Sequence, residues 1–152
     1  MSGVPDRSSV LRALALTVSF VAVGWLGAQP SHRSTQDGVY TLAQANEGKD
    51  LFAGLCQSCH TPTVHAGPPF RNKWFGHSLG ELFGYIRREM PKADPGSLSD
   101  DEYGLLVAYL MRINGMPTGS TPLAADSAAL HRIRIDSVPR TLAAPSSPGS
   151  LR

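Results

Sequence analysis

The sequence predicts an all-α fold, and three observations support this prediction. Three segments each open with a capping box, in which a Ser or Thr is followed three residues later by Glu or Gln. Apolar residues then recur at helical spacing behind each box. No two segments of alternating apolar and polar residues are joined by a turn, so no β-hairpin is predicted. We therefore expect about three main helices, joined by long irregular loops.

The first predicted helix begins after Thr41, which forms a capping box with Gln44, and it runs directly into Cys56. Gly48 lies inside this helix, where a glycine costs about 1 kcal/mol relative to alanine. A close approach by another helix would explain a glycine at that position. The residues at helical spacing are Leu42, Ala45, Gly48, Phe52 and Leu55.

An irregular loop is predicted over residues 61–77, because the segment contains three prolines and two glycines and shows no periodicity. Its aromatic residues Phe70, Trp74 and Phe75 must nevertheless be buried against other parts of the fold. His65 in this loop is expected to be a polar surface residue, as are His32 and His131.

The second predicted helix opens with a capping box formed by Ser78 and Glu81. One apolar stripe follows, made of Leu79, Leu82, Phe83 and Ile86. The helix is expected to end near Met90, because Pro91 disfavours helical geometry in the residue before it.

The third predicted helix opens with a capping box formed by Ser99 and Glu102. Two aspartates in its first turn interact favourably with the helix dipole. Asn114-Gly115 supplies a stop signal. Beyond residue 116 the composition turns to Pro, Ser, Thr, Gly and Ala. Within that segment ALHRIRI is amphipathic and is expected to pack onto the body of the domain.

Residues 1–28 carry the signature of a secretory signal peptide. Arg7 and Arg12 precede an uncharged apolar run over residues 13–28. The run has 16 residues, which is short against the roughly 20 that a spanning helix needs. If the segment is not cleaved, it would serve as an N-terminal anchor that tethers the protein to the membrane. Both outcomes place the protein in the periplasm or another extracytoplasmic compartment.

The rest of the chain divides into a polar linker over 29–40, a domain over 41–120 and a Pro/Ser-rich C-terminal extension over 121–152. The last dozen residues are expected to be disordered. The net charge of +2 is spread along the chain, so no basic stripe for nucleic acid is predicted. Three helices make a small core, and such domains usually need a disulfide, a metal or a bulky cofactor to stabilise them.

The chain's only two cysteines lie in LCQSCH, at Cys56 and Cys59, with His60 directly after the second. This motif has four possible interpretations. A zinc site lacks a second distant pair of ligands, and a thioredoxin-like pair should open a helix inside a βαβ unit. A disulfide across so short a loop would stabilise little, and it would leave His60 unexplained.

The fourth interpretation, covalent attachment of one haem c, accounts for every residue of the C-x-x-C-H motif. The two thiols add to the two vinyl groups of the haem, and the two-residue gap matches the distance between those groups. His60 is then placed to bind the iron as the proximal ligand. Protein export agrees with this interpretation, because such haem is attached outside the cytoplasm.

The chain resembles the class I c-type cytochromes over about residues 38–120. The residues that carry the resemblance are the run GVYTLAQANEGKDLFAGLCQSCH, then GPPF, then MPKADPGSLSDDEYGLLVAYLMRINGMPTG. The last run is most similar to the cytochrome c domains that serve quinoprotein dehydrogenases and related periplasmic oxidoreductases. The resemblance implies a cytochrome c fold, with the predicted helices wrapped around one covalent haem.

The resemblance also implies further site residues. Met90 matches the family's Met-Pro element and would be the distal iron ligand, with Met116 and His77 as the alternatives. Pro68 matches the position whose carbonyl accepts from the ring of the axial histidine, with Pro69 as the alternative. Trp74 would cover the haem edge, donate its N–H to a haem propionate, or serve as a plain core aromatic.

The resemblance implies a helix contact as well. Gly48 and Phe52 match the family's contact between the first and last helices. The expected partners on the last helix are Leu106 and Tyr109.

Six-coordinate iron leaves no position open to a substrate, so the sequence predicts an electron carrier and not an enzyme. The resemblance implies redox protein partners, with a periplasmic dehydrogenase as donor and a cytochrome or oxidase as acceptor. The alternative is a haem enzyme or a gas-binding sensor with a labile sixth ligand. A third hypothesis is an interaction subunit whose C-terminal extension wraps a dehydrogenase.

Overall fold

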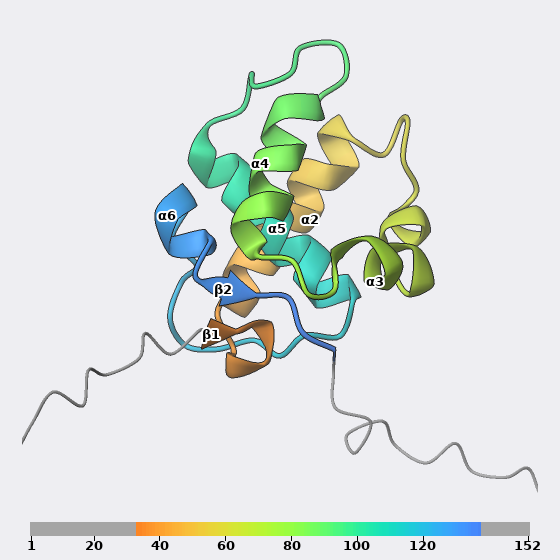
Figure 1. The fold of residues 1–152 in the computed structure, drawn as a ribbon. Helices are drawn as coiled ribbons and strands as arrows, with labels where there is room; N and C mark the ends of the chain where they lie inside the picture. The colour runs from red at the N-terminus through yellow and green to blue at the C-terminus, as the bar shows by residue number, and fades with distance from the viewer. Residues whose placement is uncertain (1–32, 138–152) are drawn as a thin grey trace, which may run out of the picture. The chain divides into compact units, whose positions relative to one another are not determined.

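A computed structural model describes residues 33–137 (Figure 1). The predicted signal segment 1–28 and the end of the predicted extension, from residue 138, lie outside the described residues. Within the described part, no helix is both long and apolar enough to cross a membrane. The elements are β1 (Arg33–Ser34), η1 (Thr35–Asp37), α2 (Leu42–Leu55), η2 (Pro62–His65), α3 (Pro68–Trp74), α4 (Leu79–Glu89), α5 (Asp100–Ile113), α6 (Ser127–Leu130) and β2 (Ile133–Arg134).

The three predicted capping boxes are confirmed at the starts of α2, α4 and α5. The hydroxyls of Thr41, Ser78 and Ser99 each accept from a backbone N–H three residues on. In return, the side chain at that third position accepts from the backbone N–H of the cap. Each box satisfies helix-start N–H groups that have no partner inside the helix, so the helices begin where the sequence predicts.

The helix pair α2 and α5 forms the centre of the fold, and its close contact explains Gly48 (Figure 1). Gly48 is buried, and a Cβ at this position would overlap the main-chain carbonyl of Leu105 on α5. The rings of Phe52 and Tyr109 lie with their centroids 5.3 Å apart. The predicted contact between the first and last helices is therefore confirmed for Tyr109, which lies against both Gly48 and Phe52, and the Leu105 carbonyl also approaches Gly48.

The predicted loop over 61–77 differs from the structure, which contains two short helices there, η2 and α3. Pro68 is the first residue of α3, and a proline is well suited to that place because its fixed φ fits a helix and its missing N–H is not needed. Phe70 is buried, and Trp74 and Phe75 pack against the core. Local proline content had indicated an irregular loop, but tertiary burial of these aromatics favours a helix.

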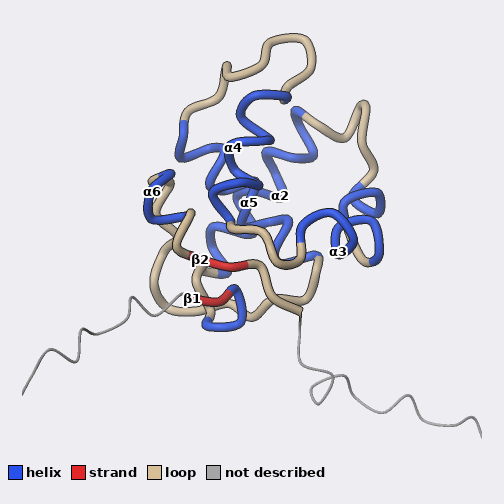
Figure 2. The backbone as a smooth tube through the Cα atoms, in the orientation of Figure 1, coloured by secondary structure: helices blue, strands red, loops and turns tan. Residues whose placement is uncertain are grey.

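The two ends of the described chain meet in a pair of parallel strands, β1 and β2, drawn in red in Figure 2. On its other side the β2 segment bonds to the loop before α4: Ile135 N–H donates to the carbonyl of His77 (2.8 Å), and Gly76 N–H donates to that of Ile135 (2.9 Å). Strands of two residues are too short to show an alternating pattern, so the sequence did not predict them.

Both ends also contribute to the core. Thr35, Val39 and Tyr40 are buried, although the sequence predicts a polar linker over 29–40. The segment ALHRIRI packs onto the body as expected, with Leu130, Ile133 and Ile135 buried.

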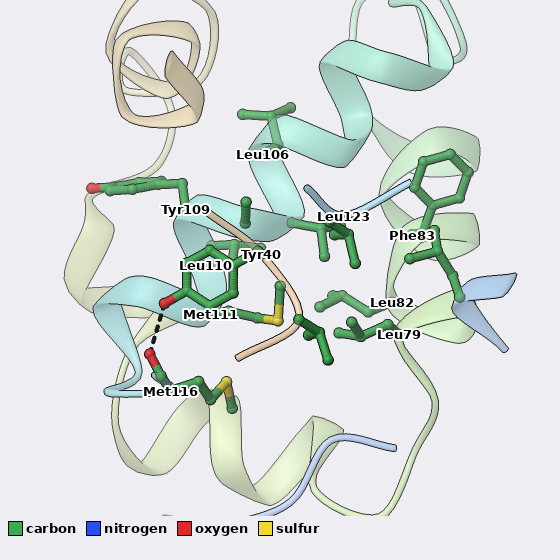
Figure 3. Close-up of a cluster of buried hydrophobic side chains, with 14 of the residues drawn as sticks. Tyr40, Leu79, Leu82, Phe83, Leu106, Tyr109, Leu110, Met111, Met116 and Leu123 are labelled. Atoms are coloured by element: carbon green, nitrogen blue, oxygen red, sulfur yellow. Dashed lines mark hydrogen bonds between the residues drawn. The ribbon is translucent and has the colours of Figure 1, made fainter. Parts of the chain in front are cut away.

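The main core lies between α4, α5 and these terminal segments (Figure 3). Figure 3 shows the Tyr40 hydroxyl donating to the carbonyl of Met116, a bond of 2.7 Å. Burial raises the pKa of Tyr40 to about 12, although the Coulombic effect of Arg112 opposes the rise. Met111 and Met116 are both fully buried in this core, at 0% and 2% exposure.

Candidate functional site

A largely apolar, partly open cavity lies beyond the main core, and the C-terminal ends of α2 and α4 both reach it. Cys56, Cys59 and His60 line it from the α2 end, and Met90 lines it from the α4 end. Most of the remaining wall is aliphatic or aromatic: Phe52, Leu55, Ile86, Leu98, Leu106 and Leu110. The structure thus brings both cysteines, the histidine and the predicted methionine to one space.

The CQSCH motif forms a tight turn directly after α2. Cys56 is the C-terminal cap of α2, and its carbonyl accepts from the N–H groups of Cys59 (3.1 Å) and His60 (2.9 Å). This turn brings the two cysteines and the histidine to the same cavity. Cys56 is half-buried and Cys59 is exposed. Burial raises the pKa of the Cys56 thiol, and the nearby Cys59 raises it further.

Hydrogen bonds to its main-chain N–H and carbonyl hold Met90 in place. As the C-terminal cap of α4, it donates its N–H to the carbonyl of Ile86 (2.8 Å). Its own carbonyl accepts from the hydroxyl of Tyr103 on α5 (2.7 Å), and Tyr103 is fully buried. The sequence does not reveal this second bond. It fixes the main chain from which the Met90 side chain reaches the cavity.

The predicted alternatives to Met90 lie elsewhere. Met116 is buried in the main core with its carbonyl bonded to Tyr40, and it does not line the cavity. His77 lies on the surface, where its Nδ1 is 3.0 Å from a carboxylate oxygen of Glu81. Of the four methionines in the chain, Met90 is the one that the described residues place at the cavity wall.

His65 lines the cavity, which corrects the expectation of a surface residue. Its ring centroid lies 5.0 Å from that of His60 and 6.0 Å from that of Phe52. Burial lowers the pKa of His65, and the Coulombic effects of His60 and Lys73 lower it further. No local sequence signal indicates this position, because the placement of His65 depends on how the loop folds back.

Asn114 fixes that loop to the end of α5. Its side-chain NH₂ donates to the carbonyls of His65 (2.9 Å) and Leu110 (2.8 Å). Its side-chain oxygen accepts from the N–H of Gly67 (2.9 Å). In the sequence, Asn114 was expected only to stop the helix. It also joins the segment after the motif to α5.

Pro68 is not among the residues that line the cavity. In residues 33–137 no hydrogen bond joins the His60 ring to Pro68 or to any other residue. The predicted role of the Pro68 carbonyl therefore stays a prediction.

Comparison with known proteins agrees with this geometry. The family model described as cytochrome c oxidase, cbb3-type, subunit III, matches residues 43–110. The matched range runs from α2 to α5, so it contains the CQSCH motif and Met90. No curated protein and no solved structure gives a match.

The match and the helical architecture together define a cytochrome c fold, which carries covalently bound haem c. The cavity fits that group: two thiols and an imidazole lie in its wall with a thioether, and the rest of the wall is mostly apolar. A protein of this class transfers electrons through its haem.

Proposed function

We propose that the protein is a monohaem cytochrome that carries single electrons from an extracytoplasmic dehydrogenase to a downstream acceptor. The observation that supports this most directly is the shared cavity of Cys56, Cys59, His60 and Met90. The two thiols would form the thioether bonds, with His60 and Met90 as the axial ligands. When bound, haem supplies one-electron exchange between Fe(II) and Fe(III).

The protein's own residues favour a carrier over an enzyme. Met90 is held at the cavity by the end of α4 and by the Tyr103 hydroxyl. A thioether fixed in this way would fill the sixth coordination position, so no site would be left for substrate. A gas-binding or peroxidatic protein would need that position to be open or labile.

The donor and acceptor are proposed by class. A dehydrogenase would supply electrons, and a cytochrome or oxidase would accept them through weak, transient contacts. Cytochrome c domains are usually extracytoplasmic, which agrees with the signal-like segment 1–28.

Intact mass and redox spectra of the exported full-length protein test the proposed function. We expect the mass to exceed that of the polypeptide by one covalent haem. A redox titration should show one reversible step that fits a one-electron Nernst curve. Replacing both cysteines, Cys56→Ala with Cys59→Ala, should abolish attachment. A protein exported without haem would overturn the proposal. A high-spin ferric spectrum would favour the gas-binding or enzymatic alternative.

A Tyr103→Phe variant tests how Met90 is held. Removing the hydroxyl leaves the Met90 carbonyl without this partner, at a cost of about 1 kcal/mol. We expect the sulfur-to-iron charge-transfer band to disappear at lower denaturant concentration than in the wild type, since the segment that carries Met90 would detach more easily.

Tyr109→Phe is the matched control, because the Tyr109 hydroxyl makes no hydrogen bond to another described residue. It should leave the denaturant midpoint of the band nearly unchanged. Equal shifts in both variants would contradict a positioning role for Tyr103.

A further inference from the structure

The outer faces of α2 and α5 form an open groove on the surface of the domain. The apolar part of its wall comes from both helices: Leu51, Gly54, Leu55 and Leu105. Leu55, at 46% exposure, is one of three exposed large apolar side chains among residues 33–137. Gly54 leaves the groove open, because no side chain apart from those of its chain neighbours lies within 4 Å of the position of a Cβ there. The groove is thus an apolar surface that is open to a partner.

The charged side chains in the wall of this groove are all acidic: Glu47 and Asp50 on α2, and Glu102 on α5. The ion pairs of the described residues use other carboxylates, those of Glu81, Glu89, Asp100 and Asp136. Hydrogen bonds from the backbone N–H and hydroxyl of Ser99 lower the pKa of Glu102 and so favour its charged form. Within the described part of the chain, the groove therefore combines apolar surface with negative charge that no nearby cation neutralises.

The groove differs in charge from the other hollows of the domain. The cavity proposed to hold haem (the haem cavity) has Lys92 in its wall, and a pocket beside α4 has Arg87 and Arg88. Leu55 is the one residue that lines both the groove and the haem cavity. It directly precedes Cys56, so the groove ends beside the proposed attachment site. A partner seated in the groove would lie next to the haem without entering the haem cavity.

We propose that this groove docks a redox partner whose contact face carries positively charged side chains around an apolar centre. The inference rests on the proposed function and names the partner by the chemistry of its face. The leucines would bury the partner's apolar surface, and the carboxylates would attract its cations and disfavour an acidic face. Because the whole chain has a formal net charge of only +2, this steering would come from the local carboxylates.

Tris(phenanthroline)cobalt(III) is a suitable probe, because it is a cation with apolar ligands and it accepts one electron. In its reaction with the ferrous, haem-loaded, full-length protein, iron is oxidised from Fe(II) to Fe(III) and cobalt is reduced from Co(III) to Co(II). Stopped-flow spectroscopy measures the second-order rate constant. Asp50→Lys reverses one exposed charge in the groove, and Asp94→Lys makes the same change at an exposed position outside it.

We expect Asp50→Lys to react with the cobalt cation about tenfold more slowly than Asp94→Lys at low ionic strength, at the lower end of the range for electrostatic steering. The difference should shrink in 1 M salt, where the Debye length is about 3 Å. Oxidation by ferricyanide, an anion, should not be slowed by Asp50→Lys. Gly54→Gln keeps the net charge but places a polar side chain in the apolar part of the groove, so it should also slow the reaction with the cobalt cation.

NMR spectra of the reduced protein give a second readout, the position of the bound probe. The inert, paramagnetic tris(phenanthroline)chromium(III) should broaden the signals of Leu51 and Leu105 before those of α4. This pattern should persist in Asp94→Lys and be lost in Asp50→Lys.

The inference is overturned if haem is attached but the two lysine variants react with the cobalt cation at equal rates, or if the broadening lies outside the groove. A dimer that dissociates in Asp50→Lys would also overturn it, because a second copy of the chain would then occupy the groove. A protein without attached haem would instead overturn the proposed function, so the two failures are distinguishable.

Discussion

Replacing Met90 with leucine is expected to remove the sulfur-to-iron charge-transfer band and to lower the reduction potential by on the order of 0.1 V or more. Axial ligands set haem potentials over a range of roughly 0.8 V, and a thioether favours the ferrous state. Leucine keeps the apolar volume of the cavity wall but cannot bind iron. Ferric spectra and equilibrium redox titration of the exported variant would measure both effects.

Met116→Leu is the matched control, since it makes the same chemical change in the main core. Met116 is 2% exposed and does not line the haem cavity. Its replacement should therefore leave the band and the potential as in the wild type, apart from a small change in stability. A band that persists in Met90→Leu, or that disappears in Met116→Leu, would contradict the proposed iron ligand.

The sequence predicted the helices well because their signals are local. Each capping box spans four residues, so Ser78 and Glu81 define the start of α4 without any knowledge of the rest of the fold. The CQSCH motif is local in the same way, because it consists of five adjacent residues and can be recognised without the rest of the fold. Met90 was predicted from family resemblance, and the structure places it at the same cavity as the motif.

The supporting contacts could not be predicted because they join distant positions. Tyr103 reaches a carbonyl 13 residues earlier, and Asn114 accepts from an N–H 47 residues earlier. The residue types do not indicate these partners. In the sequence, Tyr103 fits the apolar stripe of a helix, and Asn114 fits a helix stop signal. His65 likewise lines the cavity wall, and its own carbonyl accepts from the side chain of Asn114, 49 residues later. The residues proposed to hold the haem were therefore predicted from the sequence and its resemblance, whereas the contacts that position them were not.

Gly48→Ala is expected to destabilise the protein by about 1–3 kcal/mol, the usual cost of overpacking a tight interior. A methyl group here would overlap the Leu105 carbonyl, which belongs to the backbone of α5 and cannot rotate away. Alanine's better helix propensity offsets about 1 kcal/mol at most. Because α2 carries the CQSCH turn at its end, forcing α2 away from α5 should also broaden the haem spectrum. Denaturant unfolding of the haem-loaded protein would measure the free energy of unfolding.

Gly54→Ala makes the same substitution in the same helix and serves as the control. Apart from its chain neighbours and the backbone of its own helix, no atom lies within 4 Å of the position of a Cβ at Gly54, and the residue is exposed. Its replacement should leave the protein unchanged or stabilise it by up to about 1 kcal/mol, through helix propensity alone. The free energy of unfolding is expected to fall in Gly48→Ala and to stay the same or rise in Gly54→Ala. This difference separates the effect of the helix contact from that of helix propensity. If Gly48→Ala proved as stable as Gly54→Ala, the close approach of α2 and α5 could not be the reason for a glycine at position 48.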